Sequence, residues 1–389
     1  MSGNKKVSLS TTVAGVSLSS CVYNASGPRT GSSAAMSKIA LSKAGGVLAK
    51  SATLESQTGN DLPRCWHSAD ENASMNSEGL PNAGIDYYVS SSTISETIGE
   101  SQKAYMVSIS GKTLDDNLEM LRRIASSNSK GEIAAVELNL ACPNIIGKPI
   151  IAYDFEQMES VLKAVSDLAE KVSLPPLGVK LPPYLDGPHF ARAASVLNKY
   201  AHVVKYAASI NTIGNALAID IHAEMPAIRP KGGFAGLSGK AVKYTALANV
   251  QKMRELLSQE IDVVGVGGVS SGEDVFEMIL CGATAVQVGT CHWTEGPKCF
   301  DRICSELTTL MEEKGYTSIS DFRNKLKPWS KEGASLSRQK KSQLKNQSNT
   351  KTMTESTIHN IGFVYQLLSS VLMVFVAVLL ADKFQVIQM

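Results

Sequence analysis

A single cysteine, Cys142, stands between a strand-like apolar run and a proline in VELNLACPNIIGKP, residues 136–149. Asn139 lies three positions before it and Asn144 two positions after it. A thiol that ionises can remove a proton from a substrate, and amide side chains can both donate to and accept from a polar ring. The alternative is that Cys142 is a small buried apolar side chain at a strand end. This segment alone does not decide between the two.

Two lysines follow a similar pattern, because Lys50 and Lys180 end the apolar runs GGVLAKS and LGVKLPP. No carboxylate is obvious nearby in the sequence, so we expect each lysine to meet an anionic ligand. A fixed lysine stabilises the negative charge that develops on a reduced flavin. The alternative is a buried ion pair or a side chain that reaches solvent.

Glycines end the last two strand-like runs, VVGVGGVSSGED and AVQVGT. Gly267, Gly268 and Gly289 let a ligand approach the backbone closely. Backbone N–H groups there, together with the N-terminus of the next helix, can hold a phosphate dianion. Paired glycines are also common in ordinary turns. The pattern therefore indicates a phosphate-bearing cofactor without identifying it.

The elements that must position these groups are short apolar runs separated by segments with helical periodicity, such as DFEQMESVLKAVSDLAEKV. Such alternation is typical of a parallel sheet buried on both faces. Eight runs within about 300 residues predict an α/β fold of the (β/α)₈ TIM-barrel type, with a doubly wound open sheet as the alternative. Polar residues at the strand ends would then converge on one mouth of the barrel: Asn24, Ser26, Lys50, Ser51, Ser108, Ser110, Asn139, Cys142, Lys180, Asn211 and Thr212.

The composition is that of an ordinary globular protein, with 389 residues, 43% hydrophobic and 19% charged. The net charge of +2 gives no reason to expect a nucleic-acid partner. The seven cysteines form no CxxC pair and have no histidine at zinc spacing, so no metal site is predicted. The first residues lack the apolar run of a signal peptide, and we expect a reduced, cytoplasmic catalytic domain.

The C-terminal part differs in composition from residues 1–330. Residues 331–360 are rich in Ser, Lys, Gln and Asn, which predicts a flexible linker. Residues 361–381 carry no charge, and a helix of that length spans about 30 Å, the thickness of a bilayer core. We predict a transmembrane tail anchor there. The alternative is a buried or amphipathic terminal helix.

The flanking residues predict the orientation of this anchor. Lysines on its N-terminal side place the main domain in the cytosol. Only eight residues follow the anchor, so we expect it to insert after synthesis. Asp382 and Lys383 cancel in charge, which favours the endoplasmic reticulum over the mitochondrial outer membrane.

Several motifs, taken together and in order, resemble the class 1A dihydroorotate dehydrogenases. The resemblance runs from about residue 7 to 328 and does not cover the linker or the anchor. These FMN enzymes of pyrimidine synthesis are TIM barrels with a small inserted subdomain, so the resemblance implies this fold and a homodimer. It is carried by NASG (24–27), AKSATLESQTGNDLPR (49–64), NSEGLPNAGIDYY (76–88), ELNLACPNIIGKP, AYDFE, LGVKLPPY, INTIGNAL and CGATAVQVGT.

The resemblance also implies a reaction on a CH–CH bond, the oxidation of (S)-dihydroorotate to orotate. Cys142 would be the general base that removes the C5 proton while the C6 hydride passes to N5 of the flavin. Residues 141–151 would form a lid over the site. The implied FMN contacts are Ala25, Ser26, Lys50, Ser51, Asn139, Lys180, Ile210, Gly239, Gly267, Gly268, Gly289 and Thr290. The implied substrate contacts are Lys50, Asn76, Gly79, Leu80, Asn139, Asn144, Asn211 and Thr212.

Two positions depart from the family pattern. Thr212 replaces a serine and keeps the hydroxyl group. Glu78 stands in NSEGLPN where the family usually has methionine. A carboxylate about 4 Å from the substrate's own carboxylate would cost roughly 1–4 kcal/mol. We expect the Glu78 side chain to point to solvent. The alternatives are that it is protonated or that the substrate is not dihydroorotate.

The electron acceptor and the activity itself have alternatives. Class 2 enzymes pass electrons to quinone through an N-terminal helical hood, whereas here the barrel begins within about 15 residues of Met1. We therefore expect fumarate to be the acceptor. A class 1B enzyme, which uses NAD through an iron–sulfur partner subunit, is not excluded. The rival functions are a dihydropyrimidine dehydrogenase-like flavin enzyme and a membrane-tethered barrel without catalysis.

Overall fold

The computed structural model describes residues 6–141 and 150–339, together with Gln366 and Met373. The chain divides into two units, Met1–Leu326 and Lys327–Met389. In the second unit, residues 331–339 are helical, so the predicted linker begins with a helix. The rest of the predicted linker lies outside the described residues, as does the predicted anchor apart from residues 366 and 373. No helix within the described ranges is long and apolar enough to cross a membrane.

The first unit is built on an eight-stranded sheet in which all neighbouring strands run parallel. The sheet order is β3-β16-β15-β10-β9-β8-β7-β4. The predicted parallel barrel is therefore confirmed as a nearly closed one. The strands are β3 (Val22–Asn24), β4 (Gly46–Leu48), β7 (Ala104–Ile109), β8 (Ile133–Asn139), β9 (Leu177–Leu181), β10 (Val204–Ser209), β15 (Asp262–Val266) and β16 (Ala285–Val288).

The side chain of Asn24 joins the two end strands of this sheet. Its Nδ2 donates to the carbonyl of Leu48 at 2.6 Å, and its Oδ1 accepts from the Leu48 N–H at 3.0 Å. A side-chain amide thus takes the place of backbone ladder bonds between β3 and β4. Asn24 is one of the predicted strand-end residues, and its role in the structure is to close the barrel.

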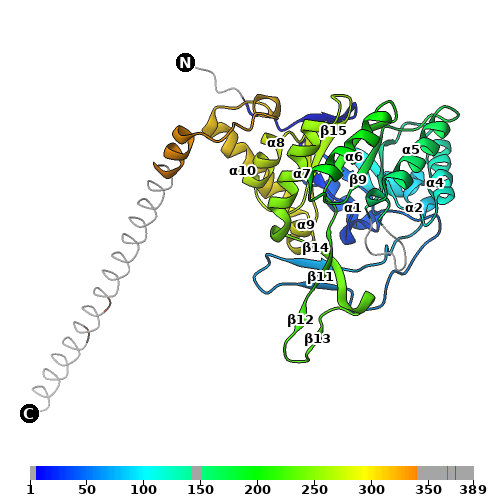
Figure 1. Cartoon of the computed structure of the whole chain (residues 1–389), viewed down its shortest axis with the longest axis horizontal. Helices are drawn as coiled ribbons and strands as arrows, with labels where there is room; N and C mark the ends of the chain where they lie inside the picture. Colours follow the sequence, from blue (N-terminus) through cyan, green and yellow to red (C-terminus); the bar gives the residue numbers. More distant parts are fainter. Residues whose placement is uncertain (1–5, 142–149, 340–365, 367–372, 374–389) are drawn as a thin grey trace, which may run out of the picture. The chain divides into compact units, whose positions relative to one another are not determined.

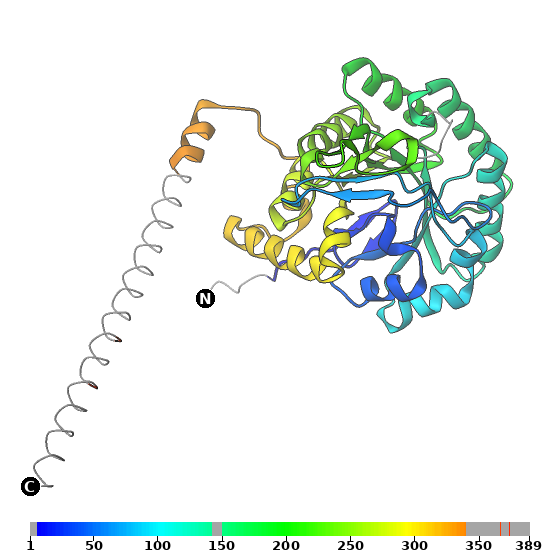
Figure 2. The same cartoon turned by 90° about the horizontal axis from the view of Figure 1, so that it is seen from below.

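Helices surround the strands (Figures 1 and 2). Several begin at side-chain caps, such as Thr113 with Asp116 and Ser271 with Asp274, which satisfy the free N–H groups of the first turn. The α-helices are α1 (Ser33–Ala40), α2 (Ile85–Val89), α3 (Ser91–Ile98), α4 (Leu114–Ser127), α5 (Phe155–Ala169), α6 (Gly187–Lys199), α7 (Lys243–Leu256), α8 (Gly272–Leu280), α9 (Thr290–Glu295) and α10 (Lys298–Lys314). The short 3₁₀ turns are η1 (Pro28–Thr30), η2 (Gly99–Ser101), η3 (Ile151–Tyr153), η4 (Pro230–Gly233), η5 (Lys240–Val242) and η6 (Ile319–Asp321).

A second, antiparallel sheet is assembled from two segments far apart in the sequence. Its order is β11-β14-β6-β5, and Asn76 pairs with Gly236 across it. One segment follows β4 and the other follows β10, so both leave the carboxyl ends of barrel strands. The strands are β5 (Cys65–His67), β6 (Ser74–Asn76), β11 (Ile213–Leu217) and β14 (Phe234–Ser238), with hairpins β12 (Ile219–Asp220) with β13 (Met225–Pro226) and β1 (Thr11–Val13) with β2 (Val16–Leu18).

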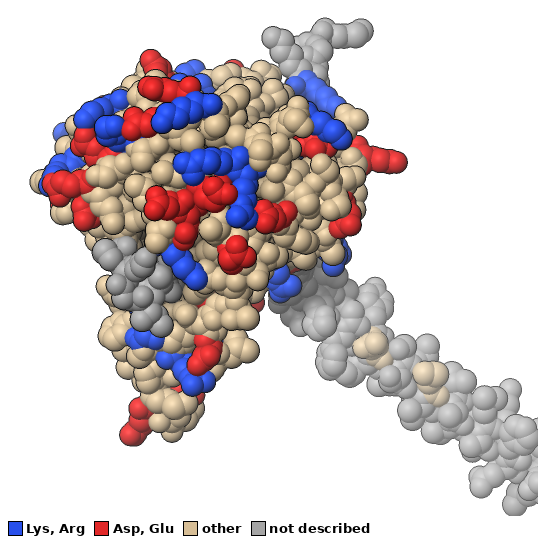
Figure 3. All heavy atoms as spheres, turned by 90° about the vertical axis from the view of Figure 1, so that its right-hand side faces the viewer, with Lys and Arg blue, Asp and Glu red and all other residues tan. Residues whose placement is uncertain are grey.

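The surface carries both signs of charge. On the face in Figure 3, Lys and Arg side chains are interspersed with Asp and Glu. Ion pairs such as Arg123–Asp86 (2.9 Å) and Arg192–Glu156 (2.9 Å) are exposed. Such pairs each contribute little to stability because water and salt screen them.

Stability should depend on pH through His292, which is buried in α9. Burial, helped by the positive charge of Arg29, lowers the pKa of His292 from 6.5 to about 4. Between these values the unfolded chain binds a proton that the folded chain does not. The free energy of unfolding should therefore fall, by up to about 3 kcal/mol, as the pH drops from 6.5 to 4. Urea unfolding at several pH values should show a shallower fall for His292→Gln. An identical pH profile for the variant would contradict this assignment.

Candidate active site

A cavity of about 430 Å³ lies at the carboxyl ends of the barrel strands, a size typical of small-molecule sites. The structure brings all twelve predicted FMN-binding residues to its wall. Four of the remaining predicted substrate residues line it as well: Asn76, Leu80, Asn211 and Thr212. Cys142 and Asn144 lie outside the described residues.

Gly79 is the exception among the predicted residues that the structure describes, because it does not line the cavity. Its φ is +69°, and a Cβ at this position would come within 2.5 Å of the Asn60 side chain. Gly79 is thus required by the tight turn that follows β6. That turn holds Asn76, Glu78 and Leu80 at the cavity wall.

Three serines and an asparagine form a polar network where β3, β4, β7 and β8 end. The Ser51 N–H donates to Ser26 Oγ at 2.7 Å, and the Ser51 hydroxyl lies 2.8 Å from that of Ser108. Asn139 Nδ2 donates to Ser51 Oγ at 3.4 Å. The network fixes the positions of side chains from four different strands, as a ligand site requires.

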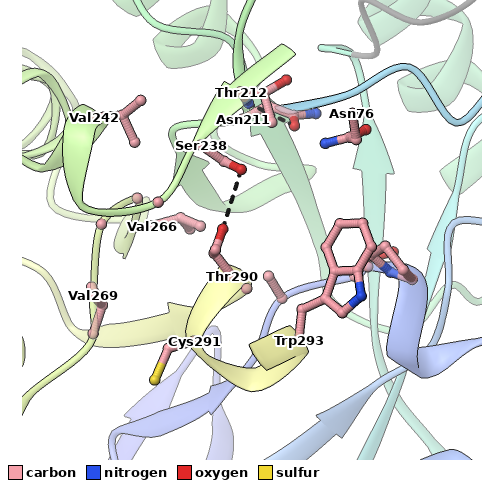
Figure 4. A pocket seen from close by; sticks show the side chains of 18 of the residues that line it. Asn76, Asn211, Thr212, Ser238, Val242, Val266, Val269, Thr290, Cys291 and Trp293 are labelled. Carbon is pink, nitrogen blue, oxygen red and sulfur yellow. Dashed lines mark hydrogen bonds between the residues drawn. The ribbon is translucent and has the colours of Figure 1, made fainter. Parts of the chain in front are cut away.

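Two of the predicted asparagines hold the residue that precedes Cys142. Asn139 Oδ1 accepts from the Ala141 N–H at 3.1 Å and from Asn211 Nδ2 at 3.3 Å. Asn211 Nδ2 also donates to the Ala141 carbonyl, at 3.1 Å. Both backbone polar groups of Ala141 are therefore fixed by these amides. Figure 4 shows Asn211 with Thr212 and Asn76 around the cavity.

The late glycines form an open stretch of the cavity wall. Gly267 has a φ of +123° and Gly268 a φ of +75°, values that residues with a Cβ rarely adopt. A Cβ on Gly268 would lie 2.6 Å from Lys243 Cβ. Elsewhere on the cavity wall, Thr290 Oγ1 donates to Ser238 Oγ at 3.1 Å (Figure 4). The glycines leave their backbone N–H groups uncovered, close to hydroxyl groups and to the start of α8. Such a combination fits a phosphate group.

Lys180 lies in the barrel interior in a network of buried polar groups. Its Nζ donates to Gln287 Oε1 at 2.7 Å and lies 3.9 Å from Glu137 Oε1. Gln287 in turn donates to Glu137 at 2.7 Å and to the Tyr23 hydroxyl at 3.2 Å. Burial lowers the pKa of Lys180, while the charge of Glu137 opposes that change.

The prediction that the two lysines have no carboxylate partner was wrong. Lys180 has Glu137, which lies on the neighbouring strand β8, two residues before Asn139. Alternation along a strand places residues 137 and 139 on the same face, and this signal could have identified the pair. Lys50 has Glu78, at 3.1 Å between Nζ and Oε2.

The prediction that Glu78 points to solvent was also wrong. Glu78 is only 8% exposed and lines the cavity. Its second oxygen, Oε1, lies 3.7 Å from Arg64 Nε and 3.7 Å from the Cys65 thiol. The turn after β6 directs the side chain inward, where two cations compensate its loss of hydration.

Sequence reasoning predicted Thr290, the first residue of α9, but missed Trp293 of α9 and Arg302 of α10, which also line the cavity. Trp293 lines it and packs edge-on against the His67 ring, with centroids 4.7 Å apart (Figure 4). Arg302 donates to Glu295 at 2.6 Å and to the Ser270 carbonyl at 3.0 Å. The signal was available, because α9 begins directly after the strand AVQV and must start at the barrel mouth.

The sequence model of one protein family, described as dihydroorotate dehydrogenase, matches residues 8–311. The chain belongs to the dihydroorotate dehydrogenase family. This confirms the resemblance drawn from the motifs and identifies the chain as a member of an oxidoreductase family.

Named relatives of the family place this chain with its fumarate-type members. It is 44% identical over 319 residues to dihydroorotate dehydrogenase A (fumarate) of Lactococcus lactis, covering 82% of this chain and 99% of that one. It is 45% identical over 303 residues to dihydroorotate dehydrogenase (fumarate) of Saccharomyces cerevisiae, covering 78% and 93%.

The fold is also that of solved dihydroorotate dehydrogenases. The ligand-free enzyme from Eimeria tenella matches with a TM-score of 0.69 at 20% identity, covering 84% of this chain and 94% of that one. The same enzyme in complex with ferulenol matches with a TM-score of 0.67 at 20% identity, covering 81% and 87%. These matches show that this chain shares its overall fold with those structures.

Proposed function

We propose that this chain oxidises (S)-dihydroorotate to orotate in pyrimidine synthesis, with FMN as its cofactor and fumarate as the electron acceptor. The observation that carries the proposal is the convergence of all twelve predicted FMN residues and four further predicted substrate residues on one cavity. The relatives named dihydroorotate dehydrogenase (fumarate) match this chain over 99% and 93% of their own lengths.

The residues present fit FMN. Gly267, Gly268, Gly289 and Thr290 would hold its phosphate, and the network of Ser26, Ser51 and Asn139 would carry its ring. When bound, FMN supplies the acceptor for a hydride. Lys180 is the buried cation at the cavity floor, where it would stabilise negative charge that develops on the ring.

The substrate side of the cavity is rich in amides. Asn76, Asn139 and Asn211 can donate to and accept from a ring rimmed with carbonyl and N–H groups. The hydroxyl of Thr212 is buried and has no hydrogen-bond partner within the described part of the chain. Its oxygen packs against Gly236, where an added Cβ would lie 2.0 Å from it, so in this structure the hydroxyl faces that glycine.

Cys142 would remove the C5 proton while the hydride leaves C6, and the two losses together form the ring double bond. Asn139 and Asn211 hold the backbone of Ala141, so the thiol follows a fixed residue. In the second half-reaction fumarate would take up the two hydrogens and become succinate. The lid predicted over 141–151 would exclude water during both steps.

A substrate and acceptor survey tests this proposal. Purified holoenzyme should oxidise dihydroorotate with fumarate much faster than with a quinone in detergent or with NAD. Glu78 in the cavity favours a second candidate, the oxidation of an uncharged dihydropyrimidine. Faster turnover of dihydrouracil than of dihydroorotate would replace the proposed reaction by that candidate.

We also propose that residues 361–381 anchor a cytosolic catalytic domain to a membrane, with the endoplasmic reticulum favoured. The full chain should sediment with membranes and resist extraction by carbonate. A chain that ends at residue 330 should stay in the supernatant with kcat changed by less than about twofold, because the cavity lies entirely within the first unit. Full-length chain in the supernatant would refute the anchor.

A homodimer is the proposed assembly. Exposed apolar side chains gather on the β11–β13 segment, where Ile219, Ile221 and Met225 are each more than half exposed. Exposed apolar side chains grouped on one short segment are typical of an interaction surface. Analytical ultracentrifugation should give a dimer mass for the 1–330 chain and a monomer mass for Ile221→Lys. A monomeric parent chain would overturn this assembly.

A further inference from the structure

Glu78 stands between two cations at the wall of the cavity. Lys50 is 3.1 Å from its Oε2, and Arg64 Nε is 3.7 Å from its Oε1. Lys50 is itself only 7% exposed. Burial and the charge of Glu78 raise the pKa of Cys65 to about 12, so this thiol stays protonated and can donate to Oε1. Donors therefore face Glu78 from both sides.

Lys50 is the cation placed to meet a carboxylate on the substrate. The other described cations that line the cavity are Lys180, Lys240 and Arg302. Lys180 is held by Gln287 and Glu137 in the barrel interior, and Arg302 is paired with Glu295 and Glu306. Lys240 belongs to η5, a different segment from the turn after β6. Of these four cations, Lys50 is the one that forms an ion pair with Glu78 in the turn after β6. That turn follows Asn76 and includes Leu80, two of the predicted substrate residues.

Lys50, Arg64 and Glu78 together carry a net positive charge, which one more carboxylate would neutralise. Lys50 and Arg64 carry two positive charges and Glu78 one negative charge. A ligand carboxylate could therefore be compensated, provided that Glu78 gives up Lys50. Arg64 is already within ion-pair distance, and its Nη1 is held in place by the carbonyls of Thr58 and Asn60 at 2.8 and 3.0 Å. It is a fixed partner to which Glu78 can turn.

We propose that Glu78 determines substrate specificity by competing for Lys50, and that it moves to Arg64 when a carboxylated substrate binds. The inference rests on the proposed function, since it assumes that a substrate carboxylate enters beside Lys50. Glu78 then weakens the binding of anionic ligands, because it competes with them for Lys50. Arg64 limits this weakening, because it offers Glu78 another cation. Uncharged ring ligands do not need Lys50 to be released, so neither residue should affect their binding.

A double-mutant cycle on Glu78 and Arg64 tests the exchange. The readouts are the dissociation constant of orotate, measured by calorimetry on the oxidised holoenzyme, and KM against kcat for dihydroorotate. Glu78→Gln should tighten orotate binding by about tenfold, because the competing charge is gone. Arg64→Gln should weaken it by about tenfold in the presence of Glu78 and by less than about twofold in its absence. The effects should fall on KM, with kcat little changed.

Matched ligands and variants complete the design. Binding of uracil, which has no carboxylate, should be the same in all four proteins, and Arg64→Lys should restore most of the orotate affinity. The exchange would be overturned if Arg64→Gln weakened orotate binding equally with and without Glu78. It would also be overturned if Arg64→Gln weakened uracil binding as much as orotate binding. If Arg64→Gln does not fold, unchanged orotate affinity in Glu78→Gln overturns the competition by itself. A parent enzyme that binds no orotate would instead refute the proposed function.

Discussion

Cys142→Ala is expected to lower kcat for dihydroorotate oxidation by about 10²–10⁴-fold, the usual contribution of a general base. The proposed reaction removes a proton and a hydride from neighbouring carbons, and without a base the proton has no acceptor beside the ring. The variant should keep its FMN, because the predicted cofactor contacts, such as Lys50, Ser51 and Lys180, are unchanged. Rapid mixing of the oxidised variant with dihydroorotate, followed by flavin absorbance, measures the loss directly.

A control for this experiment is Cys281, a buried cysteine that does not line the cavity. Cys281 ends α8, and burial raises the pKa of its thiol to about 11. Cys281→Ala should change kcat by less than about twofold, since the side chain is small and lies outside the site. Reduction of the flavin in Cys142→Ala at the rate of the parent enzyme would exclude Cys142 as the base.

Lys180→Met is expected to destabilise the protein by about 3–5 kcal/mol and to remove most of the activity. The substitution leaves Glu137, which is 1% exposed, without its cation in the barrel interior. It also removes the positive charge that would stabilise the reduced flavin. Urea unfolding in the presence of saturating FMN gives the change in stability, and steady-state turnover gives the change in activity.

The double variant Lys180→Met with Glu137→Gln separates the two effects. Removing both charges avoids an unpaired buried ion, so stability should return to near that of the parent chain. Activity should stay low, because the cation is still missing. Recovery of activity together with stability would show that Lys180 serves the fold and not the chemistry.

The barrel could be predicted from sequence because its signals are local. Strand-like apolar runs alternate with helical segments, and polar residues end the strands, so Ser26, Lys50, Asn139 and Lys180 were expected at one mouth. The structure places all four on the cavity wall. Periodicity and strand ends are properties of neighbouring residues, and a sequence displays them directly.

The charge pairs could not be predicted in the same way, because they join residues that only the fold brings together. Lys50 and Glu78 are 28 positions apart and meet through the turn after β6. The antiparallel sheet that carries this turn combines β5 and β6 with β11 and β14, whose pairing no local pattern indicates. The pair of Lys180 with Glu137 was easier to predict, because Glu137 lies on the same face of its strand as Asn139.

The most direct test of the central claim is anaerobic mixing of the purified yellow protein with dihydroorotate. The proposed function predicts that the flavin absorbance bleaches, that orotate forms in equal amount, and that fumarate then restores the colour. Protein that is purified colourless and takes up no FMN, or flavin that stays oxidised with dihydroorotate present, would contradict it.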